Sequence, residues 1–499
     1  MNKYFKSWII LIIAVPLLAT MSGGCKKFLD RKPLQASLED LNQGGVEGLV
    51  FGLYGAFLDR NGSYHAFSSI PWFALNSFRG DDAMKGSSAA DGADWGVVYD
   101  EFQYQKSHWS SSIYWDQHYN LINKANTAIQ TADSLGLNDP ASVINVAEAK
   151  FFRALAYFDL VRVFGEVPKI DFRVYTPNDS KKPKATVPQI WALIDADLTA
   201  GITNLPANWN NPLGNSRFPG RLTKYTAMAL QAKAMLYRKN WGGALSLCQQ
   251  IISSGNYQLL SSYSTNFKVA GENGKESLFE IQADLGANGV PYNGHEFGVE
   301  QGVRGSGDWD LGWGWNVPEI GQEASYETGD ARRAATILYS GQDDGYGKTV
   351  PAFPTVPRYF WNKKVYPEPS MQTFTGKKKN EWLNHVLIRY ADVLLMAAEA
   401  ANELSNQASA ITWTNLVRSR AGLPNLTFST QAQLRDDIKK ERRSEFAMEG
   451  ERFFDLVRWD DAISVLGGRG YTPCHKYYPL PQSAIDFAGS SVLIQNPCW

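Results

Sequence analysis

The sequence predicts a mainly α-helical protein, folded as one compact domain of paired helices with a loop-rich subdomain. Apolar residues recur at helical spacing in residues 115–132 and 143–164, and the pattern returns in residues 223–253 and 385–421. Between these regions, residues 266–380 are rich in glycine and aromatic residues and lack a long helical period. No low-complexity linker divides the 499-residue chain into separate domains.

The helical segments are expected to pack as hairpins. Residues 115–132 carry their large apolar side chains on one helical face, and residues 143–164 have the same apolar spacing. Residues 223–253 place small alanines between larger apolar residues, as helix pairs do where they cross closely. Residues 385–404 and 408–421 form a further expected pair. The pairs resemble tetratricopeptide hairpins, but their irregular spacing favours a compact bundle over an open solenoid.

The N-terminus has the pattern of a bacterial lipoprotein signal in residues 1–24. Two lysines and an apolar stretch too short to span a bilayer precede a run of small residues and Cys25. Ser22 departs from this pattern, because Leu is usual at that position. We expect acyl chains on Cys25 to anchor the mature chain to a membrane that it does not cross. The alternative is ordinary signal cleavage, which would leave Cys25 as an unmodified thiol.

Three of the four cysteines remain once Cys25 is lipidated. Cys248 lies in an apolar helical run, where a buried and inert thiol is expected. Cys474 and Cys498 lie in the C-terminal tail, in a compartment that allows oxidation. We therefore expect a disulfide between them, with two independent thiols as the alternative.

Composition and motifs argue against several function classes. The formal net charge of −1 lacks the basic footprint that nucleic-acid binding requires, so no nucleic-acid partner is expected. The chain has no GxSxG, HExxH or CxxC motif, and its six histidines show no metal-ligand spacing. Asp308 and Asp310 are a conceivable glycosidase pair, but a spacing of two in a loop says nothing about the separation that chemistry needs. We expect no catalytic residue, no cofactor and no metal site.

Residues 441–459, ERRSEFAMEGERFFDLVRW, interleave large apolar residues with opposite charges. They are expected to form two helical segments joined at Gly450. So many opposite charges beside aromatics of a kind usually buried indicate side chains paired with one another. A catalytic carboxylate pair is the alternative, since ionisable groups are perturbed both in active sites and in structural networks.

This run resembles the C-terminal signature of the SusD/RagB family, surface lipoproteins that capture nutrients for TonB-dependent transporters in Bacteroidetes. CKKFLDRKP at 25–33 resembles the family's mature start, although Lys26 and Lys27 replace the more usual polar or acidic residues. Three more segments are close matches in order and spacing: AEAKFFRALAYFDLVRVFGEVP at 147–168, LIRYADVLLMAAEAANE at 387–403 and YYPLPQSAIDFAGSSVLIQNP at 477–497. The resemblance implies one domain over residues 25–499. Its helical scaffold would occupy about 35–265 and 381–465, a loop-rich ligand-facing region about 266–380, and a tail 466–499.

Aromatic residues in loops are the candidate ligand contacts. Residues 302–315, GVRGSGDWDLGWGW, hold Trp309, Trp313 and Trp315 among five glycines, so no regular helix is expected there. An exposed indole offers a rigid apolar face to the C–H face of a sugar ring, while nearby polar groups bind the hydroxyls. The alternative is that these tryptophans fill a crevice in their own domain.

A second candidate wall lies in residues 67–109. The family resemblance places this region at the glycan-facing surface, so Trp95 is expected to stack on sugar and Arg79 to donate to its hydroxyls. Asp81 and Asp82 are expected to brace the loop or cap a helix. Tyr64, Trp72 and Trp109 belong either to the site or to the core, and the sequence leaves this open. Tyr292, in the loop-rich region, is a further candidate.

Two functions remain, and both imply a surface-exposed, lipid-anchored protein of the outer membrane. The first is a non-catalytic glycan-binding lipoprotein that serves a SusC-like TonB-dependent transporter. The second is a helical-repeat lipoprotein that binds peptide or protein cargo for the same type of transporter. The aromatic, low-charge loops favour sugar, because peptide grooves in helical repeats usually carry clustered charged residues.

The lipid anchor is directly testable. Cys25→Ser removes the acyl-accepting thiol, so the protein should leave the membrane fraction while its body stays folded. Fractionation with mass spectrometry of the mature N-terminus checks this, and Ser22→Leu, which restores the usual pattern, is the control that should stay anchored. A membrane-bound, unlipidated Cys25→Ser protein would contradict the prediction.

Overall fold

The computed structural model describes residues 44–58, 64–210, 218–285, 291–428 and 430–499. The chain divides into two compact units, residues 1–49 and 50–499. The predicted signal segment and Cys25 lie outside the described residues. Helix α3 (Gly45–Tyr54) begins in the first unit and ends in the second. None of the described helices combines the length and apolarity that a bilayer span requires.

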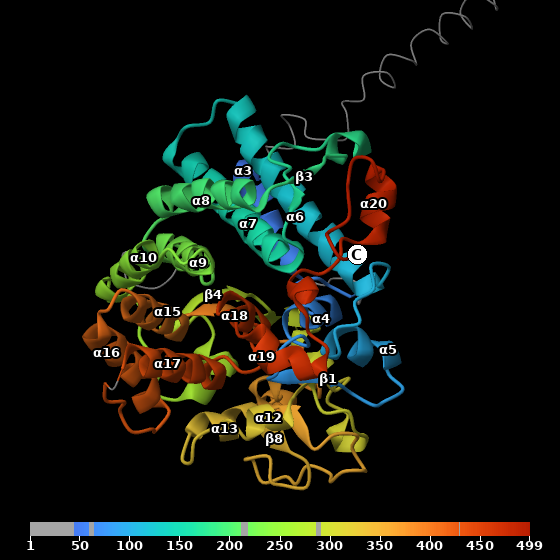
Figure 1. Cartoon of the computed structure of the whole chain (residues 1–499), viewed down its shortest axis with the longest axis vertical. Helices are drawn as coiled ribbons and strands as arrows, with labels where there is room; N and C mark the ends of the chain where they lie inside the picture. Colours follow the sequence, from blue (N-terminus) through green and yellow to red (C-terminus); the bar gives the residue numbers. More distant parts are fainter. Residues whose placement is uncertain (1–43, 59–63, 211–217, 286–290, 429) are drawn as a thin grey trace, which may run out of the picture. The chain divides into compact units, whose positions relative to one another are not determined.

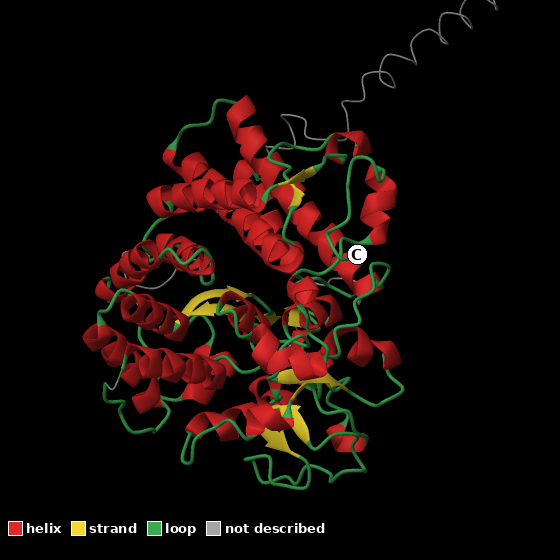
Figure 2. Cartoon of the chain, in the orientation of Figure 1, coloured by secondary structure: helices red, strands yellow, loops and turns green. Residues whose placement is uncertain are grey.

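Long helices follow one another through the second unit, each packed against the next (Figures 1 and 2). They are α6 (Trp109–Ser134), α7 (Pro140–Phe164), α8 (Val187–Asn204), α9 (Lys224–Tyr237), α10 (Trp241–Ser253), α15 (Tyr390–Glu403), α16 (Gln407–Arg420) and α17 (Gln431–Glu445). Because α10 packs directly against α15, the intervening chain leaves the helical row and then returns to it. This arrangement confirms the mainly α fold of tetratricopeptide-like hairpins.

Capping residues fix where these helices begin. Asp139 precedes α7 and accepts hydrogen bonds from the Ala141 and Ser142 amides, both at 3.1 Å. A capping box of Thr186 and Gln189 starts α8. Helix α8 was not among the helices expected from apolar periodicity, although this capping signal is present in the sequence.

The predicted helix over residues 385–404 is wrong at its start. His385–Arg389 form strand β10, which pairs antiparallel with β4 (Ser277–Ile281), and α15 begins only at Tyr390. A short apolar run can form either a helix or a strand, and periodicity alone cannot separate the two. Pairing with a strand about a hundred residues away decides the conformation here.

The loop-rich part is held by antiparallel two-stranded sheets (Figure 2). Besides β4 with β10, the pairs are β1 (Ala83–Gly86) with β7 (Trp315–Pro318), β5 (Asp284–Leu285) with β6 (Pro291–Asn293), and β8 (Ile337–Tyr339) with β9 (Phe360–Asn362). A further pair, β2 (Val167–Pro168) with β3 (Lys184–Ala185), lies in the helical part of the chain, between α7 and α8 in sequence. A small apolar core of the loop-rich part includes Val303, Leu311 and the fully buried Trp361. This part of the chain therefore has a core of its own.

Short helices complete the second unit. They are α4 (Ile70–Asn76), α5 (Ala93–Trp95), α11 (Phe297–Gln301), α12 (Ile320–Glu323), α13 (Ala331–Thr336), α14 (Pro369–Thr375), α18 (Arg452–Arg458), α19 (Ala462–Leu466) and α20 (Gln482–Ala488). In the tail, Cys474 and Cys498 form a disulfide with their Cα atoms 5.9 Å apart. Cys248 is a free thiol and is fully buried.

Residues 441–459 contain the end of α17 and the whole of α18, on either side of Gly450. Gly450 has a φ of +75°, and a Cβ at this position would collide with the Trp72 ring. The charged side chains of the run are paired. Arg442 lies 2.8 Å from Asp392 and 3.0 Å from Asp455, and all three are buried.

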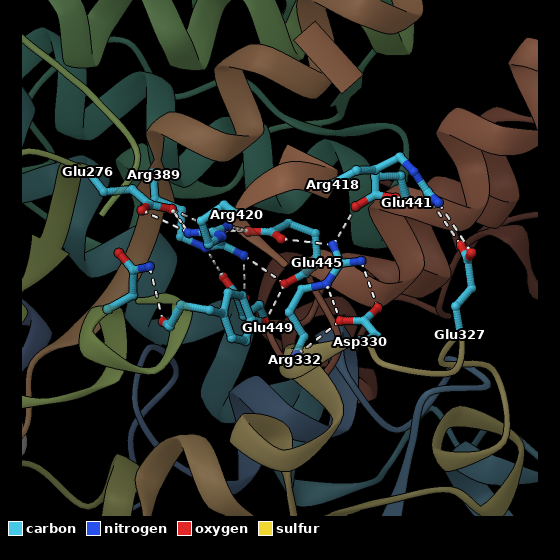
Figure 3. A network of polar contacts seen from close by, with 12 residues as sticks. Glu276, Glu327, Asp330, Arg332, Arg389, Arg418, Arg420, Glu441, Glu445 and Glu449 are labelled. Atoms are coloured by element: carbon cyan, nitrogen blue, oxygen red, sulfur yellow. Dashed lines mark hydrogen bonds and ion pairs between the residues drawn. The ribbon is translucent and has the colours of Figure 1, made fainter. Parts of the chain in front are cut away.

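A buried network of arginines and carboxylates joins the helical row to the loop-rich part (Figure 3). Glu445, at the end of α17, contacts Arg389 of β10, Arg420 of α16 and Arg332 of α13. Four carboxylates close the surrounding contacts: Glu276, Asp330, Glu441 and Glu449. A buried carboxylate near several guanidinium groups stays ionised, and removing either sign leaves an uncompensated charge in the interior.

The three arginines set the protonation of Glu445. Burial opposes its ionisation, but Arg420, Arg389 and Arg332 together hold its pKa well below the usual range. Because this pKa is lower in the folded state than in the unfolded chain, the ionised Glu445 stabilises the fold. That contribution is fully present above the unfolded pKa, near ~4.3, and is lost as pH falls below it.

Glu445→Gln should lower the free energy of unfolding at pH 7 by about 3–5 kcal/mol, because it strands buried arginines. Below pH ~4.3 the gap between wild type and variant should narrow by about 1.4 kcal/mol per pH unit, since only the wild type loses the ionised carboxylate's contribution. Urea unfolding at pH 7, 4 and 3 measures both. Glu101→Gln, at an exposed position, is the control and should change little. A gap that stays constant with pH would contradict this account.

Candidate functional site

Pairing of β1 with β7 brings the two predicted aromatic walls together. Gly86 lies opposite Trp315 in this ladder, and the Ser87 amide donates to the Gly314 carbonyl at 2.5 Å. Residues 87–109 therefore lie beside residues 302–315, although nearly two hundred positions separate the two segments in sequence. The sequence offered two separate candidate walls, and the structure makes them one.

Four aromatic rings form a stack that runs from the interior to the surface. Trp315 and Trp95 have ring centroids 4.5 Å apart, and Trp95 and Trp109 are 5.5 Å apart. Tyr64 completes the stack with its centroid 4.5 Å from that of Trp109. Exposure rises along the stack: Trp315 and Trp95 are 6% and 7% exposed, Trp109 is half-buried, and Tyr64 is 45% exposed.

Local backbone features hold this stack in place. Gly92, with a φ of +47°, precedes α5, and a Cβ there would collide with the Trp95 indole. His108 caps α6 by accepting from the Ser110 amide, which fixes Trp109 as the first residue of that helix. His108 is itself buried and lies 3.0 Å from the Tyr99 hydroxyl.

Trp313 is the exposed tryptophan of the second wall, with 48% of its surface accessible. Its amide donates to the Val299 carbonyl at 3.0 Å, which fixes the backbone next to β7. Two cations flank the ring: the Arg304 guanidinium carbon and the Lys379 Nζ lie 5.7 and 5.5 Å from its centroid. Arg304 also pairs with Asp91 of the first wall at 2.9 Å. The result is an aromatic face bordered by hydrogen-bond donors and acceptors.

Trp309 is only partly exposed. It packs against the apolar core of the loop-rich part, and its ring centroid is 6.4 Å from that of Tyr366. Its neighbours Asp308 and Asp310 are exposed and pair with Lys378 at 3.2 Å and Lys379 at 3.6 Å. These lysines give the aspartates ordinary surface ion pairs.

The prediction for Arg79 is wrong. Arg79 is fully buried, with its guanidinium carbon 4.0 Å from the Phe453 ring centroid and its Nε donating to the Leu75 carbonyl at 3.0 Å. A guanidinium can be buried when aromatic faces and backbone carbonyls satisfy it, and sequence does not distinguish that state from an exposed donor. Asp81, expected to be structural, does brace the loop, because it lies 2.5 Å from Arg452 and 3.0 Å from Arg443.

Trp95 and Trp315 also differ from the prediction, since both are buried within the stack. The Trp95 ring packs against both Trp109 and Trp315 and has too little exposed surface to stack on a ligand. The two residues support the surface instead of forming it. Tyr292 lies in β6, but its side chain is outside the described part of the structure.

The sequence did not indicate which polar residues lie around Trp313. Lys379 is 66 positions away along the chain, and Asp91 belongs to the other wall. Nothing in the local sequence of either residue marks it as a neighbour of an indole. Tyr64 and Trp109, which the sequence left undecided, lie at the exposed end of the stack.

The arrangement suits binding through ring faces and hydrogen bonds. Trp313 and Tyr64 present aromatic surface, and Arg304, Lys379 and Asp91 supply polar atoms near it. Across the described ranges, no group of three or more histidine, cysteine, aspartate or glutamate side chains is placed to hold a metal ion.

Comparison with known proteins gives the family. The model of the SusD family matches residues 318–475, and the model described as "Starch-binding associating with outer membrane" matches residues 27–236. The chain belongs to the SusD/RagB family. The resemblance found in the C-terminal run is thereby confirmed, and the second match covers the first aromatic wall.

Individual relatives support the SusD/RagB assignment over most of the chain. SusD-like protein P2 of Formosa agariphila is 29% identical over 479 residues, covering 87% of this chain and 90% of that protein. A laminarin-binding SusD-like protein of known structure is 26% identical with a TM-score of 0.73, covering 91% and 99% of the two chains. A SusD superfamily protein from Parabacteroides distasonis has the same fold, at 22% identity and a TM-score of 0.75 over 93% and 100%.

The two kinds of tryptophan in this SusD/RagB protein should respond differently to truncation. Trp95→Ala removes a buried ring and should lower the free energy of unfolding by about 3–5 kcal/mol. Trp313→Ala removes an exposed ring and should change it by less than about 1 kcal/mol. Chemical unfolding of both variants in parallel makes the comparison. Equal losses of stability would show that the two side chains do not differ in burial.

Proposed function

We propose that this protein is a non-catalytic, glycan-binding lipoprotein of the cell surface. It captures oligosaccharide or polysaccharide and delivers it to a partner TonB-dependent outer-membrane transporter. The observation that carries the proposal is the exposed Trp313 face, bordered by Arg304 and Lys379 and held by the β1–β7 pair. Sugar rings stack on such a face through their C–H groups, and their hydroxyls bond to the polar border.

The comparisons support sugar as the cargo class. One solved relative at 26% identity is a laminarin-binding protein, and one matching family description names starch binding. In this chain Trp313 and Tyr64 are exposed aromatic residues, one from each wall, and the walls are joined by the β1–β7 pair and by the Arg304–Asp91 ion pair. Both walls would then take part in binding.

Association with the outer membrane follows the same family description. The lipid anchor at Cys25 would hold the protein at the membrane surface, where a transporter of SusC type could receive the cargo. Acyl chains provide this attachment without a membrane span.

Trp313→Ala should weaken polysaccharide binding at least about tenfold, which corresponds to ~1.4 kcal/mol, while leaving the melting temperature nearly unchanged. Affinity gel electrophoresis against a panel of neutral polysaccharides, including laminarin and starch, measures the effect. Tyr175→Ala is the matched control, because Tyr175 is an aromatic residue exposed by 55% outside the β1–β7 region. Its binding should equal that of the wild type.

Two results would contradict the proposal. In the first, Trp313→Ala and Tyr175→Ala would reduce the retardation by polysaccharide to the same extent. The other is binding of peptides but of no polysaccharide in the panel, which would assign the protein to peptide cargo.

A further inference from the structure

A cavity of about 510 Å³ lies between η5 (Tyr263–Phe267), α13 and η8 (Lys363–Val365). Its volume falls within the range of roughly 300–1,000 Å³ that is typical of small-molecule sites. Three alanines of α13 face it, so a short helix with small side chains leaves the space open. The proposed glycan surface uses none of its lining residues.

The cavity is lined by four cationic side chains, and three of them already have anionic partners. Lys268 pairs with Glu368 at 2.8 Å, and Lys364 pairs with Glu449 at 2.7 Å. Arg420 pairs with Glu276 at 3.1 Å and also contacts Glu445, so the cavity adjoins the buried network (Figure 3).

Lys363 is the exception among these cations. Within the described ranges its Nζ forms no hydrogen bond and no ion pair. The nearest aspartates are engaged elsewhere: Asp344 accepts from the Tyr366 hydroxyl at 2.6 Å and from two backbone amides, and Asp343 accepts from the Gly345 amide at 2.7 Å. A second donor in the lining, Arg420 Nε, is buried without a hydrogen-bond partner.

We propose that this cavity is a second binding site, for a sugar unit that carries a carboxylate or a sulfate ester, with Lys363 as its ion-pair partner. A compact ammonium group with free donors favours a small anion. Serine hydroxyls from residues 261, 262 and 264 line the same space and suit sugar hydroxyls. Tyr346 is 42% exposed and lies parallel to Tyr366 at 6.0 Å, which gives the sugar ring an aromatic surface.

The electrostatics agree with this geometry. Burial lowers the pKa of Lys363, Asp344 and Asp343 oppose that effect, and Lys268 adds to it. The two aspartates therefore offset only part of the effect of burial on the ammonium group. A bound anion beside Nζ would supply it and would raise the pKa of Lys363.

Calorimetric titration with a matched pair of probes tests the site. The first probe is tri-galacturonic acid, and the second is the same trisaccharide with its carboxylates reduced to alcohols. Lys363→Gln should weaken binding of the acidic probe about tenfold or more and leave the weak binding of the reduced probe unchanged. Lys348→Gln removes an exposed lysine from the neighbouring loop and should bind as the wild type does.

Two further variants make the result specific. Ala335→Leu fills the cavity without changing its charge and should also abolish binding of the acidic probe. Trp313→Ala should leave that binding intact, which separates this site from the proposed polysaccharide surface. Galactose 6-sulfate and inorganic sulfate, titrated separately, distinguish a sugar-borne anion from a free one.

Three outcomes would overturn the inference. Equal affinity for the acidic and the reduced trisaccharide would remove the role of charge. Unchanged binding in both Lys363→Gln and Ala335→Leu would place any acidic ligand elsewhere. Inorganic sulfate binding as tightly as the sugar sulfate would show that the cavity accepts an anion but does not recognise a sugar.

Discussion

Glu445 is the charge on which the second unit's architecture depends. Its carboxylate is fully buried and contacts arginines from α13, α16 and β10, three elements distant from one another in sequence. None of these buried charges is stable alone, because each would lose its hydration without compensation. The elements therefore have to assemble together. The end of the helical row and the loop-rich part therefore depend on the same buried ion pairs.

The same C-terminal run also positions the proposed glycan-binding surface. Beyond Glu445, the Met448 amide donates to Asp82 at 3.0 Å, and Arg443 and Arg452 hold Asp81. Both aspartates immediately precede β1, and β1 pairs with β7, next to which Trp313 lies. Residues 441–459, which resemble the family signature, thus make short polar contacts to the residues before β1. These contacts help to position the β1–β7 pair, next to which the exposed Trp313 lies.

Much of the fold was predictable because it depends on local patterns. Apolar periodicity located most long helices, and the mixed charges of residues 441–459 indicated pairing, as the contacts of Arg442 show. Features decided by distant partners were not predictable. Strand β10 depends on β4, and the buried state of Arg79 depends on Phe453. The local sequence around an arginine does not show whether its guanidinium is buried or exposed, because tertiary contacts decide this.

The proposed glycan-binding surface also depends on contacts between residues distant in sequence, which local patterns do not predict. Trp95, Trp313 and Trp315 all occupy glycine-rich segments, yet only Trp313 is exposed, because the β1–β7 register stacks the other two against each other. The buried pair supports Trp109, against which the exposed Tyr64 ring packs, while Trp313 is held by its own backbone contact to Val299. A ligand that stacks on a ring held in this way loses less free energy to ordering than one that must first immobilise a loop. At the proposed glycan surface, stacking on Tyr64 would therefore depend on buried tryptophans that the ligand never touches.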